Sequence, residues 1–337
     1  MEEKLRLIKL WESGMSYRDI AIILNKEYNT DYWDYERVRN RIRKYRKQQE
    51  IKKVNNIQVP EIHKIPNIDS QNKKIMVMCD IHYPYHREDV LENIKKHAHE
   101  ISALVIGGDA INNDSLSKFL EISKLTFEEE IIGFYGFVKQ IRNVLPSNVK
   151  IIFIRGNHEY RLYKYIASLH EKQLAKFINP EVIQMLVDGF TIYEGVKKIE
   201  FKPIENIEYI PHWFVNINNE LIVCHPDEFS RIRGRTALNA IKYFTERGEQ
   251  FSMVLVAHTH LYDETKDFGK FGVQMGCCCK PQGYADKGSF KYQPQDYNYA
   301  IIQFDKNGKV DINATRIYHL PELYPITEQD INYKIKI

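Results

Sequence analysis

The sequence has few cysteines and no long apolar run. Only 5 of its 337 residues are cysteine, and they form neither a CxxC pair nor an even framework of spacings, so neither a zinc knuckle nor a disulfide scaffold is indicated. No stretch approaches the roughly 18 apolar residues that a membrane span needs. The start MEEKLRLIKLWE is charged, unlike a secretory signal peptide. We therefore expect a cytoplasmic protein that makes no membrane contact.

The net charge of the chain is also small, but the charged residues are unevenly distributed along it. The whole chain carries +3, whereas residues 1–55 hold 14 Lys and Arg against 9 Asp and Glu. The excess concentrates in residues 35–53, where 9 basic residues face 2 acidic ones. Such a stripe is suited to contact phosphates.

The first 50 residues predict three helices and a small all-α domain. Ser13-Gly14 ends the first helix, Ser16 is the expected N-cap of the second, and the third begins near Asp34. The expected apolar faces are Leu5, Ile8 and Trp11 in the first helix, Ile20, Ile23 and Leu24 in the second, and Tyr35, Val38, Ile42 and Tyr45 in the third.

The segment WESGMSYRDIAIILN resembles the helix-turn-helix family of DNA-binding modules. The third and most basic helix is the one that would enter the groove. Nucleic acid, with DNA favoured over RNA, is therefore the expected partner. The alternative is a bundle used for protein contacts, and the sequence leaves a homo-oligomer open. The residues expected to bind nucleic acid are Arg37, Arg39, Arg41, Arg43 and Lys44.

Residues 51–73 contain two prolines and no sustained period, which is typical of a linker. The expected organisation is a domain at 1–50, a linker at 51–73 and a second domain at 74–337. In the second domain, short β-rich runs alternate with helical stretches at 87–99, 116–144, 159–178 and 236–247, which indicates an α/β fold. The run DKNGK predicts a hairpin turn at 305–309.

Polar residues follow five of the predicted strands, at the point where each strand ends. Open α/β sheets place their sites at the carboxyl ends of strands. Burying so many histidines and carboxylates at one place without a cation is costly, so metal ions are expected there. The five clusters are Asp80-Ile81-His82, Gly108-Asp109, Gly156-Asn157-His158-Glu159, Cys224-His225 and His258-Thr259-His260.

These blocks, in this order, resemble the calcineurin-like metallophosphoesterase family and look most like its bacteriophage and prophage members. The one departure is Ala257, where the family usually has glycine. The resemblance implies a sandwich of two sheets flanked by helices, and two divalent cations bridged by Asp109. It implies that one cation is bound by Asp80, His82 and His260, and the other by Asn157, His225 and His258.

Mixed imidazole and carboxylate ligation suits Mn²⁺, which we expect to activate best, or else Fe or Zn²⁺. The resemblance makes His158 the catalytic residue that contacts the phosphoryl group and protonates the leaving group. Glu159 is expected to steady its loop through the dipole of the following helix.

Substrate contacts are predicted from position alone. Arg161, Arg233 and Arg235 lie close in sequence to ligand loops and are candidates to bind phosphates, and Tyr85 is a candidate to line the pocket. The run Cys277 to Cys279 is expected to be buried and structural, with a soft metal ligand as the alternative.

The function expected from these features is phosphodiester hydrolysis in DNA or another nucleic acid, with the basic domain raising the local substrate concentration. Two alternatives stay open. One is a phosphomonoesterase that acts on a nucleotide, a phosphoprotein or a small metabolite. The other is a DNA-binding regulator with an inactive phosphoesterase scaffold.

Overall fold

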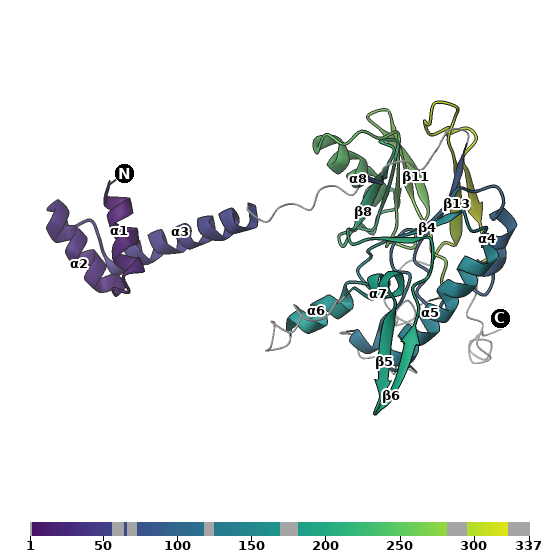
Figure 1. Ribbon diagram of the computed structural model, residues 1–337. Helices are drawn as coiled ribbons and strands as arrows, with labels where there is room; N and C mark the ends of the chain where they lie inside the picture. Colours follow the sequence, from purple (N-terminus) through teal and green to yellow (C-terminus); the bar gives the residue numbers. More distant parts are fainter. Residues whose placement is uncertain are drawn as a thin grey trace, which may run out of the picture. The chain divides into compact units, whose positions relative to one another are not determined.

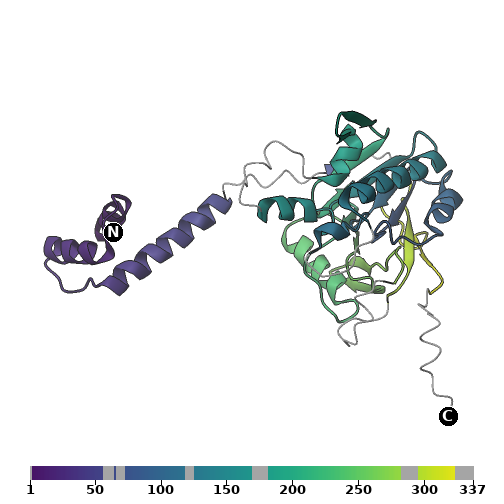
Figure 2. The same cartoon turned by 90° about the horizontal axis from the view of Figure 1, so that it is seen from below.

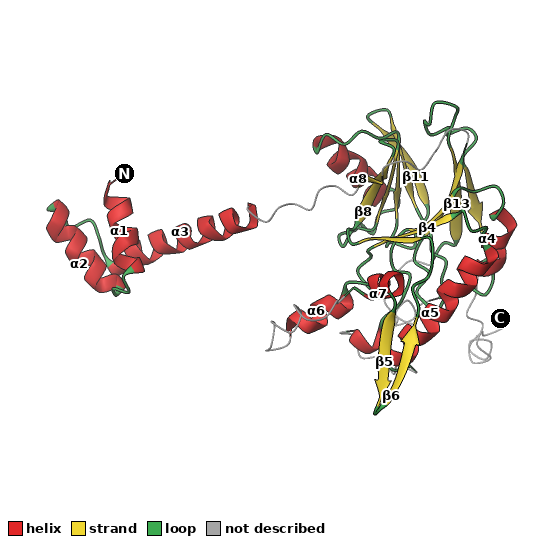
Figure 3. Cartoon of the chain, viewed as in Figure 1, coloured by secondary structure: helices red, strands yellow, loops and turns green. Residues whose placement is uncertain are grey.

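The computed structural model describes residues 2–55, 64–65, 73–117, 125–168, 181–281 and 295–322. The chain divides into two compact units, Met1–Ile62 and His63–Ile337. Figure 3 shows that the first is helical and the second combines helices with strands.

The first unit consists of helices α1 (Glu2–Glu12), α2 (Tyr17–Tyr28) and α3 (Tyr35–Asn55). The expected N-cap is confirmed, because the Ser16 hydroxyl accepts the Asp19 amide at 3.2 Å. The apolar face of α1 differs from the expected one: Leu7 and Leu10 are buried, while Leu5 is 58% exposed. This short helix is rich in apolar residues, so both the expected and the observed set fit the helical period. Packing against α2 and α3 determines which set is buried.

Helix α3 buries Val38 and Ile42, as expected, but Tyr35 is 43% exposed and lies against the ring of Tyr17. Its five predicted nucleic-acid-binding residues are all exposed. The helix ends at Asn55, five residues beyond the expected boundary at residue 50, because no helix-breaking residue interrupts it.

In the second unit the helices are α4 (Val90–His97), the 3₁₀ turn η1 (Asp114–Leu116), α5 (Phe127–Val144), α6 (Arg161–Ser168), α7 (Val182–Asp188) and α8 (Arg235–Glu246). The strands are β1 (Lys64–Ile65), β2 (Lys74–Met78), β3 (Ala103–Ile106), β4 (Lys150–Ile154), β5 (Phe190–Glu194), β6 (Lys197–Phe201), β7 (Ile207–Ile210), β8 (Phe214–Ile217), β9 (Leu221–Cys224), β10 (Met253–Val256), β11 (Asp263–Asp267), β12 (Lys270–Gln274), β13 (Asn298–Gln303) and β14 (Arg316–His319).

Two six-stranded sheets pack face to face, as the resemblance implies. Their strand orders are β1-β8-β9-β10-β12-β11 and β14-β13-β2-β3-β4-β7. Alternate residues of the inner strands, such as Val77 of β2 and Val223 of β9, form one fully buried core between the sheets. The residues in between, such as Met76, lie on the outer face of their sheet and pack under α4 and α5. Because both faces of these strands are buried, they are apolar throughout.

Helices cover both outer faces of the sandwich. Helix α8 lies on β10, β11 and β12, while α4 and α5 cover the β2-β3-β4 sheet (Figures 1 and 2). The predicted helices at 87–99, 116–144 and 236–247 therefore correspond to α4, α5 and α8, although α5 begins only at Phe127 and residues 118–124 lie outside the described part. The helix predicted at 159–178 is present as α6, and residues 169–178 lie outside the described part.

The sequence interpretation missed several strands. Most of 190–217 and 263–274 is β structure, including the separate hairpin of β5 and β6. These strands are short, and most are partly exposed; β8 is buried, but Asn216 interrupts its apolar run. The late turn is confirmed: the Asp305 carboxylate accepts the amides of Asn307 and Lys309, and β13 pairs with β14.

Candidate metal centre

The five polar clusters meet at one edge of the sandwich. Strands β2, β3 and β4 are parallel neighbours in one sheet, and β9 and β10 are parallel neighbours in the other. Their carboxyl ends lie at the same edge, which brings together side chains from distant parts of the chain. All seven predicted ligands lie in this cluster.

The first group of ligands consists of Asp80, His82 and His260. Asp80 Oδ1 lies 3.2 Å from His260 Nε2 and 3.9 Å from His82 Nε2. The two imidazole nitrogens are 3.2 Å apart. Three donor atoms this close are able to bind one cation.

The second group consists of Asn157, His225 and His258. His225 Nε2 lies 3.1 Å from Asn157 Oδ1 and 3.2 Å from His258 Nδ1. Asp109 lies between the two groups: its Oδ2 is 3.3 Å from His225 Nε2 and 3.8 Å from His82 Nε2. This is the position that a bridging carboxylate requires.

The backbone of this site is unusual. Five of the ligand residues have positive φ, a conformation that residues other than glycine adopt rarely and at a cost of about 1–3 kcal/mol. The surrounding sheets hold these loops in place, and the conformation turns the side chains toward a common centre. The residues are Asp80 (54°), His82 (50°), Asp109 (49°), His258 (79°) and His260 (56°).

Two glycines of the sequence blocks are required by close packing. At Gly108, with φ +90°, a Cβ atom would lie 2.5 Å from His225 Nδ1. At Gly156, a Cβ would overlap the Asp109 carboxylate. Any larger residue would displace a ligand, because both contacts lie below the closest approach of carbon to nitrogen or oxygen.

Hydrogen bonds on the far side of the rings orient three histidines. The Nδ1 atoms of His82 and His158 donate to the side-chain and main-chain oxygens of Asn112 at 2.9 and 2.8 Å, and Nδ1 of His225 donates to Gly107 at 3.1 Å. The Nε2 atoms of His82 and His225 therefore face the ligand groups, as ligation requires. Asn112 was missed from the sequence, although it closely follows the Asp109 cluster.

The carboxylates dominate the electrostatics of the site. Burial lowers the pKa of His225, but the carboxylates of Asp109 and Asp80 outweigh burial and raise this pKa to about 10. The pKa of His260 is likewise raised to about 9, chiefly by Asp80 against the effect of burial. Burial prevails at His82 and lowers its pKa to about 4. The two carboxylates thus demand positive charge, which divalent cations bound by the same atoms would supply while displacing these protons.

The burial of Asp80 and the mixture of donor types also favour a bound cation. Asp80 is completely buried, and its Oδ1 accepts no hydrogen bond from the described residues. Its nearest charge partners are the imidazoles of His260 and His82, at 3.2 and 3.9 Å, the groups with which it would share a cation. Mixed imidazole, carboxylate and amide donors are suited to divalent transition metals.

Glu159 stabilises its loop, as expected, and it does so through hydrogen bonds that the sequence did not predict. Its fully buried carboxylate accepts the amides of Asp109 (3.0 Å), Ala110 (2.6 Å) and Gly156 (2.8 Å), and α6 begins two residues later. Burial and the nearby Asp109 raise the pKa of Glu159 to about 7. The residue ties the loop after β3 to the loop after β4.

His158 lies beside the ligands. Its Nε2 is 3.7 Å from Asp109 Oδ2 and accepts a hydrogen bond from Arg161 Nη2 at 2.9 Å. Burial lowers the pKa of His158 well below its usual value, and Arg161 lowers it further. Arg161 also donates to the Asn112 carbonyl at 2.7 Å, so this predicted phosphate-binding residue orients His158.

The other predicted substrate residues do not line the pocket described below, and two of them bond to residues of the protein. Arg233 is exposed, pairs with Asp296 and donates to the Tyr262 carbonyl at 2.9 Å. Arg235 is exposed at the start of α8. Tyr85 donates its hydroxyl proton to Asp114.

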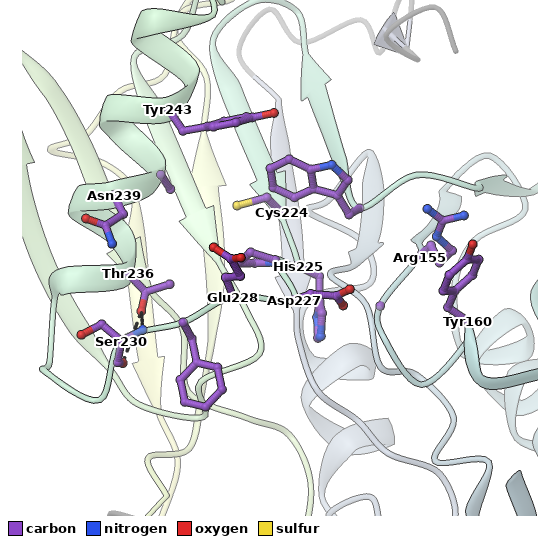
Figure 4. A pocket seen from close by; sticks show the side chains of 15 residues that line it. Arg155, Tyr160, Cys224, His225, Asp227, Glu228, Ser230, Thr236, Asn239 and Tyr243 are labelled. Carbon is purple, nitrogen blue, oxygen red and sulfur yellow. Dashed lines mark hydrogen bonds between the residues drawn. The ribbon is translucent and has the colours of Figure 1, made fainter. Parts of the chain in front are cut away.

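A pocket of about 510 Å³ opens beside the second ligand group. Gly156 and His225 line it, and the ring of Phe229, another lining residue, lies 5.1 Å from the ring of His258. Figure 4 shows Arg155 and Tyr160 on one side and Tyr243 on the other. Among the described residues that line it, none is a predicted substrate residue. Arg155, at the end of β4, was missed because its polar side chain follows the strand without matching a known block.

Fold and site together define an α/β sandwich protein with clustered carboxylate and histidine side chains that could hold divalent metal ions. A sequence profile of the calcineurin-like phosphoesterases matches residues 73–262, more than half of the chain. The chain therefore belongs to the calcineurin-like phosphoesterase family, whose members bind divalent metals. No curated protein sequence matches this chain.

Several solved structures match this chain at low sequence identity. A predicted phosphoesterase from Streptococcus pneumoniae is 11% identical, with 74% of this chain and 98% of that chain covered and a TM-score of 0.28. A single mutant of Vps29 from Entamoeba histolytica is 12% identical (74% and 99% covered, TM-score 0.32). An archaeal phosphodiesterase is 17% identical (73% and 99%, TM-score 0.32). Within the described residues, no helix is long and apolar enough to cross a membrane.

Proposed function

We propose that this protein is a dinuclear metal-dependent phosphodiesterase that acts on nucleic acid. The observation that carries the proposal is the placement of Asp109 Oδ2 between two complete ligand groups, 3.3 Å from His225 and 3.8 Å from His82. Two bound cations supply Lewis-acid stabilisation of the phosphoryl oxygens and a strong nucleophile at neutral pH. We expect Mn²⁺ to be the best activator.

The chain's own residues have distinct roles in this proposal. His158 lies beside the ligand groups with Nδ1 fixed by the Asn112 carbonyl. Its Nε2 accepts a hydrogen bond from Arg161 in the free protein, and on substrate binding it exchanges this partner for a phosphoryl or leaving-group oxygen. The negative charge of a bound phosphoester favours the protonated ring and opposes the lowering of its pKa by burial. His158 then donates the proton to the leaving group.

Two features support nucleic acid as the substrate. Helix α3 presents five exposed basic residues, the arrangement expected of an electrostatic phosphate contact. The pocket beside His225 and Gly156 carries Trp213, Phe229 and Tyr243 in its lining, and aromatic side chains stack on nucleobases. The phage type and the cytoplasmic location stay predictions.

The test compares a chromogenic phosphodiester with the matching monoester in the presence of Mn²⁺. We expect the diester to be hydrolysed faster and the full chain also to cleave DNA. A faster rate on the monoester would support the phosphomonoesterase alternative. Binding of DNA without hydrolysis of either ester would support the regulator with an inactive scaffold.

A further inference from the structure

The run Cys277 to Cys279 lies directly beside the first ligand block. The amide of Cys278 donates to the carbonyls of Cys79 (3.0 Å) and Asp80 (3.1 Å), and the amide of Lys280 donates to the Tyr85 carbonyl at 2.7 Å. The segment thus follows residues 79–85 through main-chain hydrogen bonds. All three of its cysteines are completely buried and free of disulfide bonds, as expected.

The three thiols face different surroundings. Cys278 Sγ contacts the Asn298 carbonyl at 3.4 Å and belongs to the core beneath α4 and α5. Cys277 and Cys279 both pack with Tyr297. Cys279 Sγ belongs to a group with His82 and His260 whose ligand atoms all lie within 4.8 Å of one another.

A second observation points to a ligand at the same place. Asp80 Oδ1 is buried, accepts no hydrogen bond from the described residues, and lies 3.2 Å from His260 Nε2. His82 Nε2 is 3.2 Å from the same nitrogen. The two imidazoles therefore lie close both to the Asp80 carboxylate and to the Cys279 thiol.

We propose that Cys279 is a fourth ligand of the cation held by Asp80, His82 and His260. A thiolate binds a divalent transition metal at about 2.3 Å and an imidazole nitrogen at about 2.0–2.1 Å, so the two donors are about 3.6 Å apart around one tetrahedral ion. The sulfur and the imidazole nitrogens of this group lie within 4.8 Å of one another, so they would have to approach by at most about 1.2 Å. On binding, the thiol proton passes to solvent and the sulfur–metal bond forms.

This assignment rests on the proposed metal-dependent function and narrows the choice of metal. Soft thiolates select Zn²⁺ or iron over Mn²⁺. The position with Cys279 therefore prefers Zn²⁺ or Fe²⁺, whereas the position with Asn157, His225 and His258 retains the oxygen and nitrogen donors that accept Mn²⁺. We therefore expect two different metals, Zn²⁺ or Fe²⁺ at the first position and Mn²⁺ at the second, in place of two manganese ions.

The test uses the full chain, stripped of metal with a chelator and loaded with Co²⁺. Thiolate ligation produces an intense near-ultraviolet charge-transfer absorption. We expect this band in the wild type and in the matched control Cys278→Ser, and its loss in Cys279→Ser. The affinity of Cys279→Ser for Zn²⁺, measured by competition with a chromophoric chelator, should fall at least about tenfold while its Mn²⁺ affinity changes less.

If the wild type binds two Co²⁺ ions but lacks the band, the assignment is overturned. This measurement needs no variant, so the assignment can be tested even if Cys279→Ser fails to fold. Retention of the band in Cys279→Ser with loss in Cys277→Ser also overturns it. Failure of the wild type to bind Co²⁺, Zn²⁺ or Mn²⁺ overturns the metal-dependent function itself. Hydrolysis that persists with two metals but without the band refutes only the role of Cys279.

Discussion

Glu130 stabilises the loop at residues 113–114, which contacts His158, and its raised pKa allows a quantitative prediction of stability. This α5 residue is completely buried, and its carboxylate accepts the amides of Asn113 at 2.6 Å and Asp114 at 3.1 Å. Asn113 in turn donates its side-chain amide to the His158 carbonyl at 2.9 Å. Burial, reinforced by the charge of Asp114, raises the pKa of Glu130 from 4.5 to about 7.

The sign of the pH dependence follows from proton uptake. Between pH 4.5 and 7 the folded protein retains a proton at Glu130 that the unfolded chain has released, so the free energy of unfolding falls as pH rises through this range. The difference between the two pKa values corresponds to about 3 kcal/mol at most. This contribution is fully present below pH 4.5 and lost above about pH 7.

The substitution Glu130→Gln removes this titration. Glutamine offers one acceptor oxygen for two amides, so one buried amide loses its partner at a cost of about 1–3 kcal/mol at every pH. We expect the variant to be less stable than the wild type at pH 5. Between pH 5 and 8 the difference should shrink by about 3 kcal/mol.

Urea unfolding of the full chain, followed by circular dichroism at pH 5, 6, 7 and 8 with a chelator present, measures this difference. The matched control is Glu129→Gln on the same helix. Glu129 is exposed, and hydrogen bonds from the Thr126 amide and hydroxyl lower its pKa, so it stays ionised throughout and its effect is independent of pH. A stability difference for Glu130→Gln that is constant from pH 5 to 8 would refute the reasoning.

Three further predictions concern the site and the basic helix. Asp109→Asn should abolish both two-metal binding, measured by elemental analysis, and diester hydrolysis, because a neutral amide does not bridge two cations; retention of both metals at a normal rate would contradict the bridge. His158→Ala should lower kcat by roughly 10²–10⁴ at unchanged metal content, and loss of metal would identify His158 as a ligand. Replacing Arg39, Arg41 and Arg43 by Ala should weaken salt-dependent DNA binding, measured by fluorescence anisotropy at two salt concentrations, without changing hydrolysis of a small diester. Equal DNA affinity before and after this change would assign the helical unit another role.

The residues that could be identified from the sequence are those whose structural role depends on residues close to them in the chain. The apolar runs before Asp80 and Asp109 are central strands because both faces of those strands are buried, and the polar residues after them fall at a strand end. The N-cap at Ser16 needs only the amide three residues ahead. The exposure of Arg39 and Arg43 follows from helical spacing relative to Val38 and Ile42.

Other features depended on segments distant in the sequence. Helix α1 buries Leu7 in place of Leu5 because its partners are α2 and α3, which its own period does not specify. Glu130 receives its role from amides 17 and 16 residues away. The run of three cysteines was visible in the sequence, yet only the main-chain pairing with residues 79–85 directs Cys279, and neither of its neighbours, toward His82 and His260. Local sequence determines which groups are available, and tertiary packing determines which of them share one point in space.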